Sequence, residues 1–170
     1  MEIIPIQKAH QKSVLRLYKT VTKHLLSINN DQWNLLYPNL FVIQSDLNNH
    51  NLYGIIEDQI VIGAVVLDEK QSEKYKQIDW NDKNANPVCL HRLAVHPDYQ
   101  GRGIGKLLLD YVENLAILRG YTSIRLDVYS ANKGAVGMYT KYGYVKKGEI
   151  EFPLRKYPYY CMEKQLNRQR

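Results

Sequence analysis

The sequence predicts an α/β fold in which helices cover both faces of a mixed sheet. Strand-like apolar runs alternate with helical patterns through the middle of the chain, and this alternation is typical of such folds. The chain has 170 residues, which suits one domain with a sizeable core. No internal repeat or linker interrupts it. We therefore expect a single domain over residues 1–170.

The first third of the chain predicts a strand, two helices and a hairpin. A short strand is expected at residues 3–6, and apolar residues then recur at helical spacing from about residue 8 to 26. A second helix is expected to end near Asn48. Residues 52–57 and 60–67 are rich in residues that favour strands, and the two polar residues between them predict a hairpin turn.

The segment 68–87 is polar and lacks clear periodicity. A loop of about 20 residues is unusual inside a compact domain and often forms a lid or a binding loop. A plain surface loop explains the same composition equally well. Tyr75 and Trp80 lie within this segment. The sequence does not decide between a lid or binding loop and a plain surface loop.

The rest of the chain predicts, in order, a strand, a helix, a strand, a short helix and two final strands. The first of these helices carries a broad apolar stripe and stops at Gly120, which is a typical residue just after a helix. The expected elements lie at residues 88–95, about 103–119, 123–129, 132–142, 144–152 and 157–166.

Composition and charge narrow the class of protein. The net charge of +6 favours anionic partners such as a CoA-type cofactor, a nucleic acid or an acidic lipid surface. The basic residues are scattered and do not alternate with aromatic residues on one helix face, so we expect no nucleic-acid partner. No apolar run approaches the roughly 20 residues that span a bilayer, and the N-terminal residues lack the regions of a signal peptide. We expect a cytoplasmic protein with no membrane partner.

Two cysteines, Cys89 and Cys161, lie in apolar stretches that predict strands. Buried thiols in a reducing compartment explain this placement better than a disulfide or a metal site. No spacing of cysteine and histidine residues resembles a zinc site, so no metal is expected.

The most informative segment covers residues 93–105, where an apolar strand leads through Pro97 into a glycine-rich turn and a strong helix. This order places backbone N–H groups without partners at a helix N-terminus, where they can bind phosphate without any cationic side chain. The alternative is a glycine-rich turn between strand and helix that binds no ligand.

The glycine spacing excludes two nucleotide-binding motifs. A dinucleotide fingerprint needs a third glycine where the chain has Lys106. A P-loop needs a glycine in place of Gln100 and a serine or threonine in place of Leu107. The pattern that remains is Gln100-x-x-Gly103-x-Gly105.

This pattern resembles the acyl-CoA pyrophosphate loop of the GNAT-superfamily N-acetyltransferases. A second motif of that family consists of an asparagine, an alanine and a tyrosine before an aromatic-Gly-aromatic segment. It is matched in order by Asn132, Ala135, Tyr139 and Tyr142-Gly143-Tyr144. The resemblance spans at least residues 90–147 and extends to the whole chain through the earlier helices and the hairpin.

The resemblance also implies a more specific fold. It is a central mixed, mostly antiparallel, twisted sheet of six to seven strands, splayed between the strands at 88–95 and 123–129. Gln32-Trp33, Tyr37-Pro38 and the aromatic segment 157–160 look like a bacterial branch of GNAT proteins whose substrate is not settled.

The function implied by the resemblance is acetyl transfer from acetyl-CoA to a primary amine of a small molecule or peptide, by direct attack in a ternary complex. Two other classes remain open. One is an acyl-CoA-binding sensor or regulatory module that has lost catalysis, and the other is a basic nucleic-acid-binding domain, which has no motif of its own here.

The resemblance assigns the cofactor largely to backbone groups. Leu93, Ala94 and Val95 would pair with the pantetheine arm as an added strand does, and the N–H of Val95 would point at the thioester oxygen. Asn132 would contact the pantetheine or stabilise the splayed strands. The pyrophosphate would be held by the amides of Gln100, Gly101, Arg102, Gly103, Ile104, Gly105 and Lys106.

Tyr139 matches the family position of the general acid that protonates the leaving thiolate. A phenol with a pKa of about 10 suits donation to an alkyl thiolate, whose conjugate acid has a pKa of about 8.5 in cysteine. The alternative for Tyr139 is a tyrosine that only packs on a short helix.

His91 is the candidate general base. Strand alternation predicts that it shares a face with Leu93 and Val95, and an imidazole pKa of about 6.5 suits a base at neutral pH. The strand resembles that of the arylalkylamine N-acetyltransferases, in which a histidine at this place relays the amine proton. Other branches use a glutamate where this chain has Cys89. A structural or substrate-contacting histidine remains the alternative.

The acceptor amine, the acyl-chain preference and the oligomeric state are not fixed by the sequence. Dimers are common among similar proteins, so a homodimer stays open. A cationic amine favours a carboxylate and an aromatic wall. Residues in segments that could supply them are Trp33, Tyr37, Glu69, Asp79, Trp80 and Tyr157, although core packing is as good an explanation for the two tryptophans.

Overall fold

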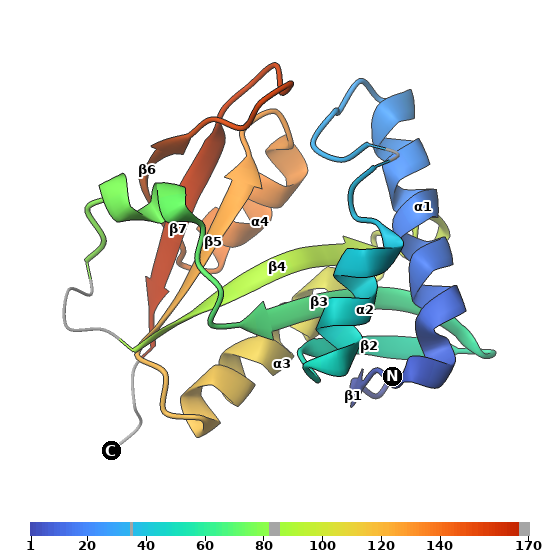
Figure 1. Cartoon of the computed structure of the whole chain (residues 1–170). Coiled ribbons are helices and arrows are strands. Elements are labelled where there is room, and N and C mark those ends of the chain that lie inside the picture. The colour runs from blue at the N-terminus through green and yellow to red at the C-terminus, as the bar shows by residue number, and fades with distance from the viewer. Residues whose placement is uncertain (35, 82–85, 167–170) are drawn as a thin grey trace. The chain divides into compact units, whose positions relative to one another are not determined.

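The computed structural model describes residues 1–34, 36–81 and 86–166, which form an open seven-stranded mixed sheet and four α-helices (Figure 1). The strand order is β1-β2-β3-β4-β5-β7-β6. The strands are β1 (Ile4–Pro5), β2 (Leu52–Glu57), β3 (Ile60–Asp68), β4 (Pro87–Val95), β5 (Ser123–Tyr129), β6 (Val145–Ile150) and β7 (Tyr159–Gln165). The helices are α1 (Gln11–Ser27), α2 (Leu40–Asn48), α3 (Ile104–Leu118) and α4 (Lys133–Lys141).

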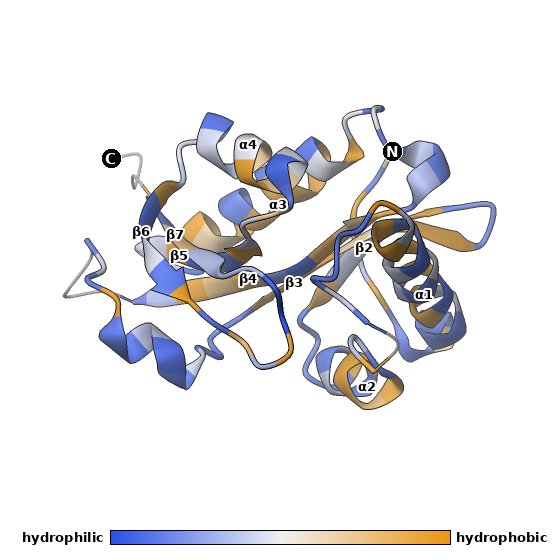
Figure 2. Ribbon diagram, turned by 90° about the horizontal axis from the view of Figure 1, so that it is seen from above, coloured by the Kyte–Doolittle hydropathy of each residue, from blue (hydrophilic) through white to orange (hydrophobic). Residues whose placement is uncertain are grey.

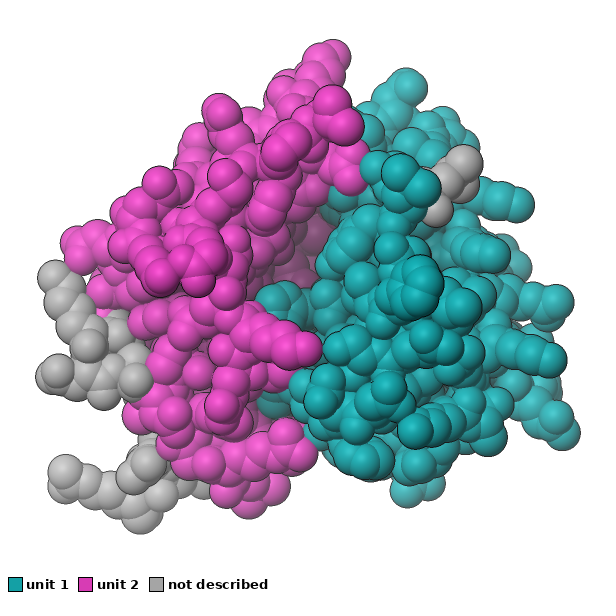
Figure 3. Space-filling view, in the orientation of Figure 1, with its two compact units in different colours: residues 1–67, 91–112 teal, residues 68–90, 113–170 magenta. Residues whose placement is uncertain are grey.

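The predicted elements are all present, and most boundaries shift by one or two residues. The predicted α/β class and the mixed, mostly antiparallel sheet are confirmed, with seven strands rather than six. The chain divides into two compact units, shown in different colours in Figure 3. Unit 1 comprises residues 1–67 and 91–112, and unit 2 comprises residues 68–90 and 113–170.

Unit 1 begins with antiparallel strands. β1 pairs with β2, and β2 pairs with β3. Asp58 and Gln59 join β2 to β3, and both have positive φ angles, +48° and +64°. A two-residue turn with φ positive at both positions matches the right-handed twist of the flanking strands. The predicted hairpin is therefore confirmed.

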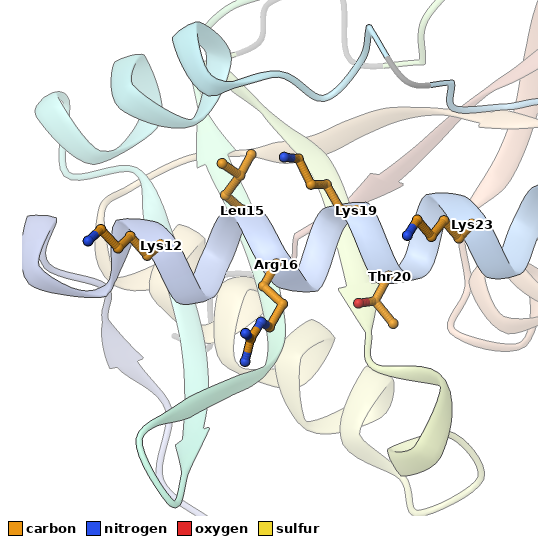
Figure 4. Close-up of a pocket in the computed structure, with 6 residues that line it drawn as sticks. All are labelled: Lys12, Leu15, Arg16, Lys19, Thr20 and Lys23. Atoms are coloured by element: carbon orange, nitrogen blue, oxygen red, sulfur yellow. The ribbon is translucent and has the colours of Figure 1, made fainter.

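Helix α1 is amphipathic and is held by its apolar face, as Figure 2 shows by colour. Its buried residues pack against α2, β2 and β3 in the core of unit 1. Its outer face carries only cations among its charged residues, and like charges four residues apart oppose helix formation. Burial of the apolar face therefore stabilises α1. The outer face lines a hollow of about 340 Å³ bounded by Lys12, Leu15, Arg16, Lys19, Thr20 and Lys23 (Figure 4).

The start of α3 approaches β3 closely. A Cβ atom on Gly63 would lie 2.8 Å from Cγ2 of Ile104 and 3.1 Å from Cδ1 of Leu108. Only glycine fits this contact without a shift of these side chains. The absence of a side chain at Gly63 thus places the first turn of α3 against the sheet.

Unit 2 contains the antiparallel ladders β5–β7 and β7–β6 and a short parallel ladder between β4 and β5. This parallel ladder covers three residue pairs and ends at Cys89↔Arg125. The segment 68–87 contains a short 3-10 helix, Glu73–Gln77. Tyr75 and Trp80 are buried in a core cluster with both cysteines. These two aromatic residues therefore pack in the interior of unit 2, and part of the segment, residues 82–85, lies outside the described residues.

Both cysteines are free and buried, as predicted. Burial raises the pKa of the Cys161 thiol to about 12 and that of Cys89 further still. Among the described residues, no group of three or more histidine, cysteine and acidic side chains is arranged to hold a metal ion. In the same part of the chain, no helix has the length and hydropathy needed to cross a membrane.

Candidate functional site

The glycine-rich turn leads into the N-terminus of α3, as predicted. The first helical hydrogen bond runs from the N–H of Leu107 to the carbonyl of Gly103, at 3.0 Å. By helix geometry, the N–H groups of Ile104, Gly105 and Lys106 have no acceptor within the helix. The first turn carries no acidic side chain that would compete for them. This helix end therefore favours an anion.

Two glycines give the turn its shape. Gly101 and Gly103 have φ angles of +76° and +79°, a region that other residues adopt only with strain. Apart from the adjacent residues of the chain, no heavy atom lies within 4 Å of a Cβ built on either glycine. The backbone conformation therefore requires glycine here, and the space beside the turn is open to a ligand.

Side chains of this segment hold the turn in place. The Gln100 amide donates to the Val95 carbonyl at 3.2 Å. The Arg102 guanidinium donates to the Asp98 carbonyl at 3.0 Å and lies 4.8 Å above the centre of the Tyr99 ring. Both polar side chains thus bond to the backbone of unit 1, which leaves the predicted pyrophosphate contacts to backbone amides.

The end of β4 lies beside this turn in unit 1. Ala94 is buried, whereas Leu93 and Val95 are half-buried. The N–H of His96 donates to the carbonyl of Ile62 on β3 at 2.8 Å, which fixes the end of the strand. All predicted cofactor-binding residues from Leu93 to Lys106 therefore belong to one unit, while Asn132 and Tyr139 belong to the other.

Arg92 is the feature of β4 that the sequence did not reveal. Its φ angle is +50°, although it lies inside a strand. Its guanidinium donates two hydrogen bonds to the Asp46 carboxylate, at 2.7 and 3.1 Å, and one to the Tyr37 hydroxyl at 3.0 Å. The Tyr18 hydroxyl donates to the Arg92 carbonyl at 2.9 Å. Burial opposes the charge, but Tyr37 and Asp46 outweigh it and raise the pKa of Arg92.

This conformation corrects the argument made for His91. Side chains alternate between the two faces only in a regular strand. The left-handed backbone of Arg92 interrupts this alternation between His91 and Leu93 within β4. Alternation therefore no longer places His91 on the face of Leu93 and Val95. His91 itself is half-buried on β4. Its role as a base stays a prediction.

Tyr139 lies on α4 and is 6% exposed. Its ring packs edge-on against that of Tyr144, with centroids 5.5 Å apart. Burial, and then the charge of Asp127, raise the pKa of Tyr139 above its ordinary value. The phenol therefore keeps its proton throughout the physiological pH range, as a proton donor must.

Asn132 is the N-cap of α4. Its side-chain oxygen accepts a hydrogen bond from the N–H of Ala135 at 3.1 Å. Asparagine is among the residues that favour this position. The two motif residues Asn132 and Ala135 are thus linked by a helix cap, and a contact of Asn132 with the pantetheine stays a prediction.

Asp127 is a candidate that sequence reasoning missed. It lies in the middle of β5, half-buried, and accepts a hydrogen bond from the Tyr75 hydroxyl at 2.7 Å. Burial is the main cause of the raised pKa values of Tyr75, Tyr139 and Cys89, and the charge of Asp127 raises them further. The sequence signal that could have revealed it is a carboxylate between apolar residues of a predicted strand. In the structure, this carboxylate is a proton acceptor whose charge acts on Tyr139.

Comparison with known proteins decides the family. The model of the acetyltransferase (GNAT) family matches residues 17–144, which is most of the chain. The chain belongs to this family. The match includes both GNAT motifs, the turn before α3 and the segment from Asn132 to Tyr144.

Individual relatives agree with this assignment. An acetyltransferase of Pectobacterium atrosepticum is 44% identical over 52 residues, which are 31% of this chain and 37% of that protein. A protein of Bacillus subtilis subsp. natto named "Probable spermine N(1)-acetyltransferase" is 32% identical over 79 residues, which are 46% of this chain and 51% of that protein. The chain thus spans about a third to a half of the length of these curated relatives.

A solved structure supports the GNAT fold over nearly the whole chain. The GNAT-family acetyltransferase of Streptococcus agalactiae 2603 superposes with a TM-score of 0.82 at 20% identity, and the match covers 96% of this chain and 94% of that one. At this identity the likeness establishes the fold.

The six residues considered for the acceptor site of this GNAT protein differ in burial and in hydrogen bonding. Trp33 and Trp80 are each 8% exposed and belong to the cores of units 1 and 2. Tyr37 bonds to Arg92, and Glu69 accepts a hydrogen bond from the Tyr121 hydroxyl at 2.7 Å. Asp79 and Tyr157 are exposed. Core packing thus accounts for both tryptophans.

Proposed function

We propose that the protein transfers an acetyl group from acetyl-CoA to a primary amine, by direct attack in a ternary complex. The observation that carries the proposal is the turn before α3. It combines glycines with positive φ, open space and unpartnered N–H groups, in a chain of the GNAT family. These features fit a pyrophosphate, because they supply hydrogen-bond donors without a competing carboxylate.

The backbone of unit 1 would do most of the binding. The amides of Gln100 to Lys106 would hold the pyrophosphate, and Leu93, Ala94 and Val95 would pair with the pantetheine arm. The N–H of Val95 would donate to the thioester oxygen as negative charge develops there. A donor fixed in advance in this way stabilises the transition state without reorganisation.

Tyr139 would supply the proton that the leaving thiolate takes up. Its raised pKa ensures that the proton is present at neutral pH. Replacement by phenylalanine keeps the ring against Tyr144 and removes only the hydroxyl. Loss of a general acid lowers a rate by about 100-fold or more. A Tyr139→Phe variant with unchanged turnover would exclude the acid role.

The proton of the attacking ammonium needs an acceptor, and two groups are candidates. His91 on β4 is the first. Asp127 is the second, because its carboxylate lies inside the buried strand β5 and its charge, after burial, contributes to the raised pKa of Tyr139. His91→Ala should lower the rate chiefly below pH 8 if the imidazole is the base. Asp127→Asn should lower it across the pH range if the carboxylate is. The pH–rate profiles of the two variants decide between them.

The substrate class proposed is an amine on a small molecule or a peptide. The relative named as a spermine acetyltransferase makes polyamines the first acceptors to test. Arylalkylamines, amino sugars, amino acids and peptide N-termini complete the panel. A homodimer remains a further proposal, which size-exclusion chromatography with light scattering would test.

Two measurements test the function. Acetyl-CoA should raise the melting temperature, because ligand at 100 times its Kd stabilises the native state by about 2.7 kcal/mol. Thiol release should then appear with at least one amine of the panel. No shift at millimolar acetyl-CoA would overturn the proposal, whereas a shift without thiol release from any amine would favour a non-catalytic acyl-CoA sensor.

A further inference from the structure

We propose that Arg92 is a positioning residue, which holds β4 in the conformation that presents the backbone of Leu93 to Val95 to acetyl-CoA. The inference rests on the proposed function, because it concerns the same site. It assigns to three side chains of unit 1, Tyr18, Tyr37 and Asp46, the task of keeping Arg92 in its conformation. We call Arg92 and these three residues the Arg92 clamp.

The backbone of Arg92 is strained. A residue with a Cβ atom and without a short polar side chain rarely adopts a φ of +50° inside a strand. Such conformations persist where the surroundings impose them, and they cluster at functional sites. Arg92 directly precedes the three residues whose backbone would pair with the pantetheine arm, so its conformation sets the path of that segment.

The Arg92 clamp holds both the backbone and the side chain of this residue. The Tyr18 hydroxyl, fully buried on α1, donates to the Arg92 carbonyl at 2.9 Å. Asp46 on α2 accepts two hydrogen bonds from the guanidinium, one on each carboxylate oxygen. A bidentate pair of this kind fixes orientation as well as charge. Tyr37 holds the third donor, so three separate parts of unit 1 converge on one residue.

A regular strand would not need such a clamp. A buried arginine pair does not by itself need a left-handed backbone, since Arg125 pairs with Glu163 from a regular ladder. The structure instead couples the ion pair to a left-handed backbone and to a hydrogen bond on the same residue's carbonyl. This coupling is the observation that separates a positioning role from a purely structural one.

Arg92→Ala and Arg92→Gly together form the decisive test. Both variants lose the same ion pair, but alanine prefers an extended backbone, whereas glycine adopts positive φ at little cost. We expect the Kd of acetyl-CoA, measured by calorimetry, to rise about tenfold in Arg92→Ala, which corresponds to the loss of one hydrogen bond. Arg92→Gly should bind more tightly than Arg92→Ala. A purely structural ion pair predicts equal affinity in the two folded variants, because both have lost the same pair with Asp46.

A spectroscopic signal tests the position of the backbone directly. In acetyl-CoA labelled with 13C at the thioester carbonyl, the bound resonance reports the hydrogen bond to that oxygen. It should move toward its position in free acetyl-CoA in Arg92→Ala and less so in Arg92→Gly. Arg92→Lys and Tyr18→Phe are milder variants that should move it in the same direction, and they serve if Arg92→Ala does not fold.

Arg125→Ala is the matched control. Arg125 pairs with Glu163 inside unit 2, so its loss should lower the melting temperature and leave the labelled resonance in place. Wild-type protein that fails to bind acetyl-CoA would overturn both the function and this inference. Wild-type binding with an unchanged Kd and an unchanged resonance in the folded clamp variants would overturn this inference alone.

Discussion

Two arginines with largely buried side chains, one in each unit, make nearly the same ion pair in different backbones. Arg92 pairs with Asp46 in unit 1, with side chains 11% and 4% exposed, and Arg125 pairs with Glu163 in unit 2, with side chains 9% and 0% exposed. Arg125 lies in a regular ladder directly opposite Glu163. Arg92 instead has a φ of +50° and reaches a carboxylate on a helix.

The difference shows that similar arginine–carboxylate pairs can have two different structural roles. The Arg125 pair joins two adjacent strands, and its guanidinium also lies 4.6 Å from the Trp80 ring centre and bonds to Gln71. Glu163 and Trp80 are buried in unit 2, whereas Gln71 is exposed. The Arg92 pair stabilises a conformation that the chain would not adopt by itself. Stability alone explains the first pair, whereas the second shapes a segment next to the candidate site.

The largest expected effect is the loss of either carboxylate. Asp46→Ala and Glu163→Ala each leave a buried guanidinium without its partner, and such losses cost about 3–5 kcal/mol of stability. Urea unfolding should show similar destabilisation for the two variants. Only Asp46→Ala should also weaken acetyl-CoA binding by the protein that remains folded. Equal loss of binding in both variants would remove the distinction between the two pairs.

The regular elements could be predicted from the sequence because they depend on local patterns. The conformation of Arg92 could not, because it depends on contacts between residues far apart in the chain. Strands and helices follow from local patterns, such as the alternation around residues 123–129 and the apolar stripe of α3. The φ angle of Arg92 follows from contacts with Tyr18, Tyr37 and Asp46, which are 46 to 74 residues away in the chain. No local pattern around Arg92 records those contacts.

Two buried tyrosine hydroxyls extend the comparison at a smaller scale. Tyr18 donates to the Arg92 carbonyl in unit 1, and Tyr75 donates to Asp127 in unit 2. Replacement of either by phenylalanine leaves a polar group without its donor and should cost about 1–3 kcal/mol. Denaturant unfolding measures this cost. Tyr18→Phe should in addition weaken acetyl-CoA binding, while Tyr75→Phe should alter the pH–rate profile if Asp127 is the base.

Alkaline pH should separate the units by their tyrosines. Burial raises the pKa values of Tyr75, Tyr139 and Tyr144 in unit 2 and of Tyr18 in unit 1. The neutral phenol is therefore favoured in the folded state, and its contribution is complete below pH 10. Above pH 10 the unfolded chain ionises first, so stability falls by about 1.4 kcal/mol per pH unit for each phenol.

Hydrogen exchange with mass spectrometry can follow this loss in each unit. Because unit 2 holds three of these four phenols, its amides should lose protection at a lower pH than those of unit 1. Tyr144→Phe should move the onset in unit 2 to higher pH, and it leaves unit 1 as an internal reference. Simultaneous loss of protection in both units would show that they unfold as one cooperative body.

The candidate site was predictable where backbone roles follow from motif spacing. Residues 100–105 could be read as an anion site because glycine spacing and helix onset are local features. Asp127 was harder to find, because its importance follows from tertiary interactions. It accepts a hydrogen bond from Tyr75, and its charge, after burial, contributes to the raised pKa of Tyr139. The burial of Tyr75 was not predicted, and core packing was one of two explanations left open for Trp80. Their segment has no periodicity, and tertiary contacts alone bury them.

The smallest expected effect tests the role of Asn132 against a matched cap. Asn39 caps α2 in unit 1 and Asn132 caps α4 in unit 2, and each side-chain oxygen accepts an N–H at 3.1 Å. Replacement of either by alanine should cost about 1 kcal/mol of stability, measured by denaturant unfolding. If Asn132 also contacts the pantetheine arm, only Asn132→Ala should raise the Kd of acetyl-CoA. Equal affinity in the two variants would leave Asn132 as a helix cap, because the motif residue would then do no more than Asn39 does.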